Sequence, residues 1–319
     1  MNERNQNGLA IETIGLVKRY NEEVLAVDGV DLAIPANSIY SLLGPNGAGK
    51  TTTLSILTTL LEPTAGTARV AGLDVVSQAN DVRKIIGVTF QETVLDDTLT
   101  GWQALEFHGK LYNLSKAKRQ AKIEELLALV ELEDAAQRKI KTYSGGMKRR
   151  LELIRGLMTN PQVLFLDEPT LGLDPQSRAR LGDYIRDLKE KQGLTVLLTT
   201  HYMDEAQLLS DAVGIIDQGK IIAEGTPQEL IQQMGADVIN IEGQGESDQF
   251  MDALQTLPFT RTVSVTDGLI QVGVDTGNRR LVEVVSVASD KGYRIEDISV
   301  AKPSLGDVFL KYTGRQFRD

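Results

Sequence analysis

Short apolar runs alternate with longer amphipathic stretches along the first two thirds of the chain. Alternating or wholly apolar runs predict strands, whereas apolar residues spaced at helical intervals predict helices. Strands are expected at residues 11–17, 24–34, 38–43, 68–71, 85–90, 163–166, 195–199, 212–217 and 220–224. Helices are expected at residues 51–61, 102–140, 178–191 and 227–234. This alternation predicts an α/β core that contains buried parallel strands.

The pattern changes near residue 235. Beyond it, strands are expected at residues 238–241, 262–265, 269–274 and 294–300, and helices at residues 247–257, 279–291 and 304–312. The segment Thr266-Asp267-Gly268 favours a hairpin between the second and third of these strands. The order β-α-β-β-α-β is that of a ferredoxin-like unit. We therefore predict a first domain at residues 1–235 and a small α/β accessory domain at residues 236–319.

Composition narrows the classes of function. A length of 319 residues is enough for more than one domain, and a net charge of -10 disfavours nucleic acid as a partner. The absence of cysteine excludes disulfides and thiolate metal sites and is typical of a cytosolic chain. The polar N-terminus does not resemble a signal peptide, and the apolar runs are far shorter than the roughly 20 residues of a membrane helix. We therefore expect a chain that docks on a membrane rather than crossing it.

A glycine-rich segment joins the strand at residues 38–43 to the next helix. It reads Gly44-Pro45-Asn46-Gly47-Ala48-Gly49-Lys50-Thr51-Thr52, a complete Walker A pattern. Its glycines allow backbone N–H groups to point at phosphate oxygens, and the helix start adds a positive dipole end. Lys50 is placed to reach the β- and γ-phosphates, and the Thr51 hydroxyl to ligate Mg²⁺. The strand before it and the helix after it argue against a chance glycine-rich turn.

Two carboxylates follow the apolar run at residues 163–166. Asp167 is placed to hold Mg²⁺, and Glu168 is placed to act as the general base that polarises the attacking water. Taken alone, the pair also fits an ordinary strand end with solvated acids. Together with the Walker A pattern it predicts a P-loop NTPase, a class that includes nucleotide kinases, GTPases and DNA-repair ATPases.

A third motif narrows this class. The segment Tyr143-Ser144-Gly145-Gly146-Met147 precedes an amphipathic helix at residues 148–158. It resembles the Leu-Ser-Gly-Gly-Gln signature of the ABC transporter ATPase family, with changes only at its two ends. Further matches occur in the family's order: Tyr20 resembles the adenine-stacking aromatic, Gln91 the Q-loop glutamine, Asp174 the D-loop aspartate and His201 the switch histidine. The resemblance covers about residues 9–230.

This resemblance implies a mechanism. Ser144, Gly145 and Gly146 would form a second anion site that reaches the γ-phosphate bound by a facing copy of the chain, so that a head-to-tail homodimer encloses two ATP molecules. Gln91 would sense Mg²⁺ and signal to a permease, Asp174 would lie at the dimer interface, and His201 would contact the γ-phosphate. The helical subdomain, about residues 95–160, would face the permease.

The signature and the tail at residues 303–314 are similar to the daunorubicin-resistance (DrrA-like) branch of exporters, which pairs its ATPase with a separate ABC-2-type permease. The resemblance implies export of a drug, antibiotic, lipid or similar substrate, driven from the inner face of the cell membrane. Alternatives are an importer subunit, which would share the chemistry, and a DNA-repair or translation-factor ATPase. The latter two classes carry long coiled coils, zinc cysteines or two cassettes, none of which occurs here.

Other polar residues have simpler interpretations. His201, Gln91 and Tyr20 could each serve only in packing or turns, and His108 is expected to be a surface or packing residue. The run at residues 148–150, Lys-Arg-Arg, favours a solvated helix face over a nucleic-acid patch. The accessory domain contains no catalytic constellation, and we expect it to stabilise or regulate the ATPase dimer.

Overall fold

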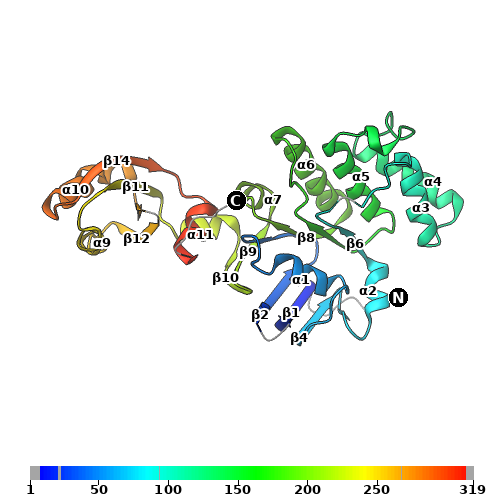
Figure 1. Ribbon diagram of the computed structural model, residues 1–319, viewed down its shortest axis with the longest axis horizontal. Helices are drawn as coiled ribbons and strands as arrows, with labels where there is room; N and C mark the ends of the chain where they lie inside the picture. The colour runs from blue at the N-terminus through cyan, green and yellow to red at the C-terminus, as the bar shows by residue number, and fades with distance from the viewer. Residues whose placement is uncertain (1–7, 21–22, 93, 267, 314–319) are drawn as a thin grey trace.

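The computed structural model describes residues 8–20, 23–92, 94–266 and 268–313 (Figure 1). Three parts of the sequence predictions lie outside these ranges: residues 1–7, Asp267 of the expected hairpin turn, and Gly314 of the tail. The strand, loop and helix pattern of the first domain and the element order of the second are both present. The predicted α/β class with a ferredoxin-like C-terminal unit is therefore confirmed.

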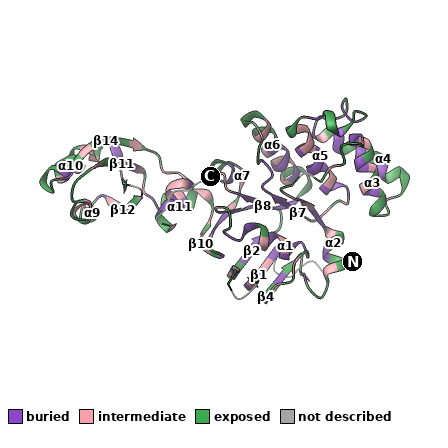
Figure 2. Ribbon diagram, in the orientation of Figure 1, coloured by how far each residue is buried: buried purple, intermediate pink, exposed green. Residues whose placement is uncertain are grey.

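A six-stranded sheet forms the centre of the first domain, in the order β10-β9-β3-β8-β7-β6. Five of its strands run parallel, and β10 is antiparallel to β9. The strands are β3 (Ile39–Leu43), β6 (Ile86–Thr89), β7 (Val163–Asp167), β8 (Thr195–Thr200), β9 (Ala212–Asp217) and β10 (Lys220–Gly225). Every residue of β3, β7 and β8 is buried, as expected for parallel strands covered on both faces (Figure 2).

A four-stranded antiparallel sheet packs beside it, in the order β2-β1-β4-β5. Its strands are β1 (Leu9–Arg19), β2 (Leu25–Pro35), β4 (Ala65–Val70) and β5 (Leu73–Asp74). One hydrophobic core joins this sheet to helix α1 (Lys50–Leu57) and to one side of the central sheet, through residues such as Val27, Leu54 and Phe165. A second core, which includes Leu105, Leu151 and Leu198, lies under the helices on the other side.

The first domain contains eight α-helices in its described residues. They are α1 (Lys50–Leu57), α2 (Ala79–Ile85), α3 (Gly101–Leu111), α4 (Lys116–Leu129), α5 (Gly145–Leu157), α6 (Pro175–Gln192), α7 (Met203–Leu209) and α8 (Pro227–Gln232). The single helical stretch predicted at residues 102–140 is wrong in detail, because Asn113 at φ 56° ends α3 before Ser115 begins α4. Helices α2 and α7 were not predicted.

The C-terminal unit has the sheet order β12-β13-β11-β14, with every neighbouring pair antiparallel. Its elements are β11 (Asp237–Gln244), α9 (Ser247–Gln255), β12 (Thr260–Thr266), β13 (Leu269–Val274), α10 (Gly277–Asp290) and β14 (Arg294–Ala301). Both helices pack on one face of the sheet, over a core that includes Ile239, Phe250, Val272 and Val284. Phe250 stacks on Tyr293 with 4.7 Å between ring centroids.

The last helix, α11 (Leu305–Thr313), returns to the first domain. Leu305, Val308 and Phe309 share a buried cluster with Ala206 of α7 and Leu230 of α8. Residues beyond the boundary predicted near residue 235 therefore contribute to the core that contains α7 and α8. None of the helices in the described residues is both long enough and apolar enough to cross a bilayer.

Candidate nucleotide-binding site

The glycine-rich loop leads from the end of β3 into α1. Gly47 and Gly49 adopt positive φ values of 80° and 106°. A Cβ atom at Gly49 would lie 2.4 Å from the carbonyl oxygen of Ala26, and one at Gly44 would lie 2.3 Å from that of Ile216. Glycine is therefore required here both by backbone conformation and by close approach, as in a loop whose N–H groups surround phosphate.

Lys50, the first residue of α1, is buried and folds back over this loop. Its ammonium group donates to the carbonyl oxygens of Gly44 at 2.6 Å and Pro45 at 3.2 Å. It also lies 3.1 Å from Oε1 of Glu168. A buried lysine that is held beside a phosphate-binding loop is positioned for an anionic ligand.

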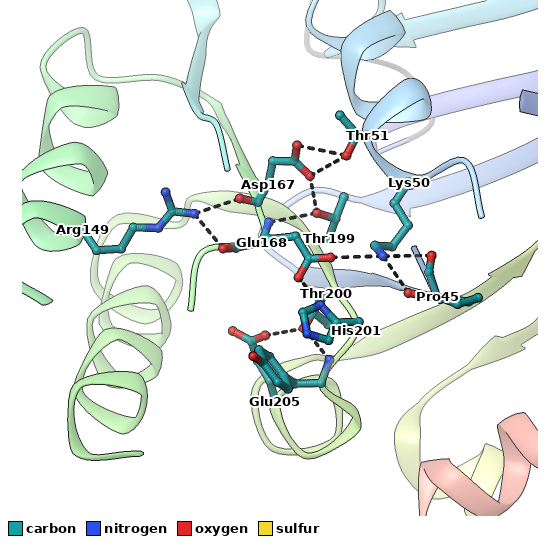
Figure 3. A network of polar contacts seen from close by, with 12 residues as sticks. Pro45, Lys50, Thr51, Arg149, Asp167, Glu168, Thr199, Thr200, His201 and Glu205 are labelled. Carbon is teal, nitrogen blue, oxygen red and sulfur yellow. Dashed lines mark hydrogen bonds and ion pairs between the residues drawn. The ribbon is translucent and has the colours of Figure 1, made fainter. Parts of the chain in front are cut away.

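Two carboxylates end β7, as the sequence predicted (Figure 3). The Thr51 hydroxyl donates to Asp167 Oδ2 at 3.1 Å, and the Thr199 hydroxyl donates to Asp167 Oδ1 at 2.6 Å. The Glu168 N–H donates in turn to Thr199 Oγ1 at 3.0 Å. Glu168 has a φ of 47°, a strained conformation for a non-glycine residue that is common at functional sites. Pairing of β7 with β8 thus fixes both acids against the loop.

His201 completes the group. Its Nδ1 lies 2.7 Å from Glu168 Oε2, while Lys50 approaches the other oxygen of the same carboxylate. The residues Lys50, Asp167, Glu168 and His201 come from three different segments of the chain. The parallel strands bring them together at their carboxyl ends, along one edge of the sheet (Figure 3). This edge combines a phosphate-binding loop, oxygen atoms suited to Mg²⁺ and a carboxylate beside two basic groups.

Comparison with known proteins assigns the chain to a family. Residues 27–171 match the family model described as ABC transporter, and residues 225–313 match that of the DrrA1-3-like ATP-binding protein C-terminal domain. The daunorubicin resistance ATP-binding protein DrrA3 of Streptomyces coeruleorubidus is 43% identical over 306 residues, with 96% of each chain covered. The chain is a DrrA-like ABC transporter ATP-binding protein. As the sequence predicted, it is the ATP-hydrolysing subunit of an ABC exporter.

Other relatives agree with this assignment. The daunorubicin/doxorubicin resistance ATP-binding protein DrrA of Streptomyces peucetius is 42% identical, covering 97% of this chain and 94% of its own. The linearmycin resistance ATP-binding protein LnrL of Bacillus subtilis is 35% identical, covering 97% and 100%. A solved ATP-binding cassette, described as a post-hydrolysis dimer bound to ADP and Pi, is 27% identical with a TM-score of 0.62. The match covers 68% of this chain and 98% of that one.

The signature residues of this ABC ATPase form the start of α5. Ser144 is the N-cap, and its hydroxyl accepts from the Met147 N–H at 3.2 Å. Asp174 caps the neighbouring helix α6 by accepting from the Ser177 N–H at 3.0 Å. Hydrogen bonds from the side chain and the N–H of Ser177 lower the pKa of Asp174. A Cβ atom at Gly146 would lie 2.8 Å from Ser177 Oγ, so the two helix starts lie side by side.

The structure places these two helix starts apart from the P-loop contacts. Within the described residues, no hydrogen bond or ion pair links Ser144, Gly145, Gly146 or Asp174 to Lys50 or Thr51. The sequence-predicted residues thus fall into two groups, one around the P-loop and one at the starts of α5 and α6.

Tyr20 and Gln91 are both exposed. The Tyr20 hydroxyl lies 3.4 Å from Thr52 Oγ1, which places the residue beside the P-loop, and Tyr20 is 52% exposed. Gln91 follows β6 and Phe90, and the carbonyl of Phe90 accepts from Arg149 at 2.7 Å. Tyr20 therefore lies beside the P-loop group. Gln91 is connected to that group only through Phe90, the residue before it, whose carbonyl accepts from Arg149.

The expectation that residues 148–150 form a solvated face is wrong for Arg149. This side chain is buried and donates to the carbonyl oxygens of Asp167, Glu168 and Pro169 at 2.8, 2.7 and 2.6 Å. It also lies 3.2 Å from a carboxylate oxygen of Glu152. Arg149 therefore holds the backbone of both acidic site residues.

Sequence reasoning also missed three residues of β8 and α7, which are Thr199, Thr200 and Glu205. The Thr200 hydroxyl donates to Glu205 Oε2 at 2.5 Å. Burial raises the pKa of the Glu205 carboxyl above its usual range, and the hydrogen bond from Thr200 partly opposes this. Two hydroxyls at the end of an otherwise apolar strand were the signal, because β8 borders the strand that carries Asp167.

Proposed function

We propose that the chain acts as one half of a homodimer that binds two ATP molecules with Mg²⁺ and drives export through a separate ABC-2-type permease. The observation that carries this proposal is the convergence of Lys50, Glu168 and His201 beside the glycine-rich loop. The group contains a cation for phosphate, a base for water and a histidine that contacts that base, which are the groups that phosphoryl transfer to water requires.

The chain's oxygen atoms fit a magnesium ion. Thr51 and Asp167 would hold it, since their side-chain oxygens already lie 3.1 Å apart. Within the described residues there is no cluster of three or more His, Cys, Asp or Glu that could bind a metal, and Mg²⁺ in nucleotide sites typically takes only one or two protein carboxylates with phosphate oxygens. When bound, the ion neutralises charge on the phosphates.

The remaining roles follow from the contacts. Lys50 exchanges its carbonyl and Glu168 partners for phosphate oxygens when ATP enters the loop. Glu168 then orients the attacking water and accepts its proton. His201 holds Glu168 and, through its other nitrogen, contacts the γ-phosphate, and Tyr20 lies where an adenine ring can stack on it. Gln91 completes the site when the segment after β6 moves inward.

The second group of residues would act across the dimer. The starts of α5 and α6 present backbone N–H groups and the Ser144 hydroxyl, which suit a phosphate from a facing copy. The related cassette described as a dimer with ADP and Pi supports this arrangement. Because ADP lacks the γ-phosphate, hydrolysis removes the contact that bridges the two copies and reopens the dimer.

An exposed apolar surface on the helical subdomain suits the permease. Val94, Phe107 and Leu111 are 62%, 59% and 63% exposed. Phe107 and Leu111 lie four residues apart on α3, so their side chains share one face of that helix. Val94 precedes the subdomain, and its carbonyl accepts from the Arg155 guanidinium of α5 at 2.9 Å. Neighbouring exposed apolar side chains mark interaction sites. We place the chain at the inner face of the cell membrane, where it would drive export of a drug, antibiotic or lipid-like compound.

The accessory domain is proposed to stabilise or regulate the ATPase dimer. In support, α11 joins it to the helix that follows His201. A Cβ atom at Gly306 would lie 3.1 Å from the sulfur of Met203, so the two helices approach closely. A change in the position of the accessory domain is thereby connected to α7.

The Glu168→Gln variant tests the ATPase dimer. It should bind ATP, lose hydrolysis and elute as a dimer in size-exclusion chromatography with ATP but not with ADP. Adding Ser144→Arg should return it to a monomer that still binds ATP. Hydrolysis by Glu168→Gln at the parental rate would refute the general-base role.

Membrane association tests the permease surface. With an ABC-2-type permease co-expressed, the parental chain should co-purify with membranes. The variant that combines Phe107→Glu and Leu111→Glu should not, although its basal ATPase activity should remain. Co-purification of this variant at the parental level would show that the permease binds elsewhere.

A further inference from the structure

Tyr202, directly after His201, contacts two side chains of different origin. Its ring centroid lies 4.0 Å from that of the His201 imidazole, with 42° between the planes. The guanidinium carbon of Arg178 lies 3.8 Å from the centroid of the same tyrosine ring. Arg178 belongs to α6, whereas His201 follows β8. The Tyr202 ring therefore connects His201 to α6, a helix that is separated from His201 in the sequence by β8.

The backbone on both sides of His201 is fixed by a second set of contacts. The Tyr202 N–H donates to Thr200 Oγ1 at 2.9 Å. The Thr200 hydroxyl donates to Glu205 at 2.5 Å (Figure 3). Thr200 and Glu205 are both buried. The residues before and after His201 are thus tied to one carboxyl group in the first turn of α7, which leaves the imidazole little freedom beyond its own side-chain torsions.

The Glu205 carboxyl is also influenced by Thr170 and Arg178. Burial raises its pKa above the usual range, and a hydrogen bond with Thr170 and the charge of Arg178 both oppose that rise. Arg178 Nε is buried and has no hydrogen-bond partner within the described residues. Buried polar groups without partners are rare in native structures and are destabilising. The place of Arg178 against the Tyr202 ring therefore indicates a role other than stabilisation of the fold.

We propose that Tyr202, Arg178 and Glu205 are positioning residues that hold the His201 imidazole against Glu168. The inference rests on the proposed function, because that function gives Glu168 and His201 their roles. The contact to be maintained is the 2.7 Å approach of His201 Nδ1 to Glu168 Oε2. Misplacement of a reacting group by about 1 Å can cost about 100-fold in rate. The Tyr202 ring fixes the orientation of the imidazole, and the Glu205–Thr200 pair fixes its backbone.

The proposal also connects the two groups of site residues. Arg178 lies one turn after Asp174, the cap of α6, and α6 begins beside the signature glycine Gly146. A displacement of α6 when a facing copy binds would move Arg178, and with it the ring that contacts His201. The position of the histidine would then depend on occupancy at the dimer interface.

The test uses the full-length chain and steady-state hydrolysis of MgATP. Tyr202→Leu should lower kcat by about 10- to 100-fold while KM and ATP binding stay within about twofold, because ground-state binding does not depend on the ring. Tyr202→Phe, which keeps the ring, should rescue most of kcat. Leu208→Ala is the control on α7, the helix that Tyr202 caps, since Leu208 is 75% exposed and its replacement should leave kcat unchanged.

A second arm asks whether the tyrosine acts through the histidine. In a His201→Ala background, Tyr202→Leu should lower kcat no further, because residues that act through a shared partner are not additive. Arg178→Gln should show the same pattern, and it replaces Tyr202→Leu if that variant has a melting temperature too low for assay.

The outcomes distinguish failure of the positioning proposal from failure of the proposed function. If His201→Ala lowers kcat but Tyr202→Leu and Arg178→Gln do not, the positioning proposal is wrong and the proposed function stands. If Tyr202→Leu lowers kcat equally with and without His201, the ring has a structural role only and the proposal is wrong. If His201→Ala itself keeps the parental kcat, the histidine has no role and both fail.

Discussion

Replacement of Arg149 by methionine should destabilise the first domain strongly. Arg149 donates to four backbone carbonyl groups, those of Phe90, Asp167, Glu168 and Pro169. It also pairs with Glu152 at 3.2 Å, where both side chains are almost fully buried. Methionine has a similar length and no donor, so it leaves a buried carboxylate without its cation and several carbonyls without a partner.

The magnitude follows from these contacts. Removing one partner of a buried ion pair typically costs about 3–5 kcal/mol. Each carbonyl left unpaired adds about 1–3 kcal/mol unless water reaches it. We therefore expect a loss of at least about 3–5 kcal/mol, and more if water does not reach the carbonyls. This is a large part of the roughly 5–15 kcal/mol by which a domain is stable.

Urea unfolding followed by circular dichroism measures this loss. Lys148→Met is the matched control, because the neighbouring Lys148 makes only a partly exposed pair with Asp97 and should cost less than about 1 kcal/mol. Adding Glu152→Gln to Arg149→Met should restore part of the stability, since the unpaired charge is removed and the amide oxygen can still accept from the Val94 N–H. An Arg149→Met loss no larger than that of Lys148→Met would refute the reasoning.

Three further predictions concern nucleotide binding, catalysis and pH. Gly49→Ala should abolish ATP binding in a fluorescent-nucleotide assay, because a Cβ atom would clash with the Ala26 carbonyl and φ is 106°; parental binding would contradict this. Asp167→Asn should bind ATP but show hydrolysis lowered at least about 100-fold at saturating Mg²⁺, and parental hydrolysis would exclude Asp167 as a magnesium ligand. Burial and the charge of Arg155 lower the pKa of His108 to about 4. Because the unfolded chain then binds a proton that the native chain does not, stability should fall as pH falls from about 6.5 towards 4. His108→Gln should flatten that slope in urea titrations, and an unchanged slope would exclude His108.

The local motifs made much of the site predictable. Continuous apolar strands, the glycine loop and the two acids after residue 166 each depend on short-range sequence, and the structure brings Lys50, Asp167, Glu168 and His201 together. Arg149 was not predictable from local pattern, because a lysine-arginine run has the composition of a solvated face. Its burial depends on the segments at the ends of β6 and β7, whose carbonyls become available to it only in the tertiary fold.

Helix lengths and the domain boundary were less predictable for a related reason. Asn113 and Glu131 take positive φ values of 56° and 54° at helix ends, and neither residue interrupts the amphipathic pattern. Helices α2 and α7 have only seven residues each, too few to show a clear period. The return of α11 to the first domain reflects packing between residues far apart in the chain. Hydrophobic periodicity gives no information about such contacts.

The path of α11 has a consequence for how the protein is made. Leu305, Val308 and Phe309 complete a core that begins with Leu43 of β3, so the first domain depends on residues translated after the whole ferredoxin-like unit. During synthesis the later unit can fold while the earlier one still lacks a helix, reversing the usual N-terminal-first order. A ribosome-bound chain truncated at residue 301 should therefore carry an exposed apolar patch around Leu230 and Met234, the surface on which a chaperone would act until α11 emerges.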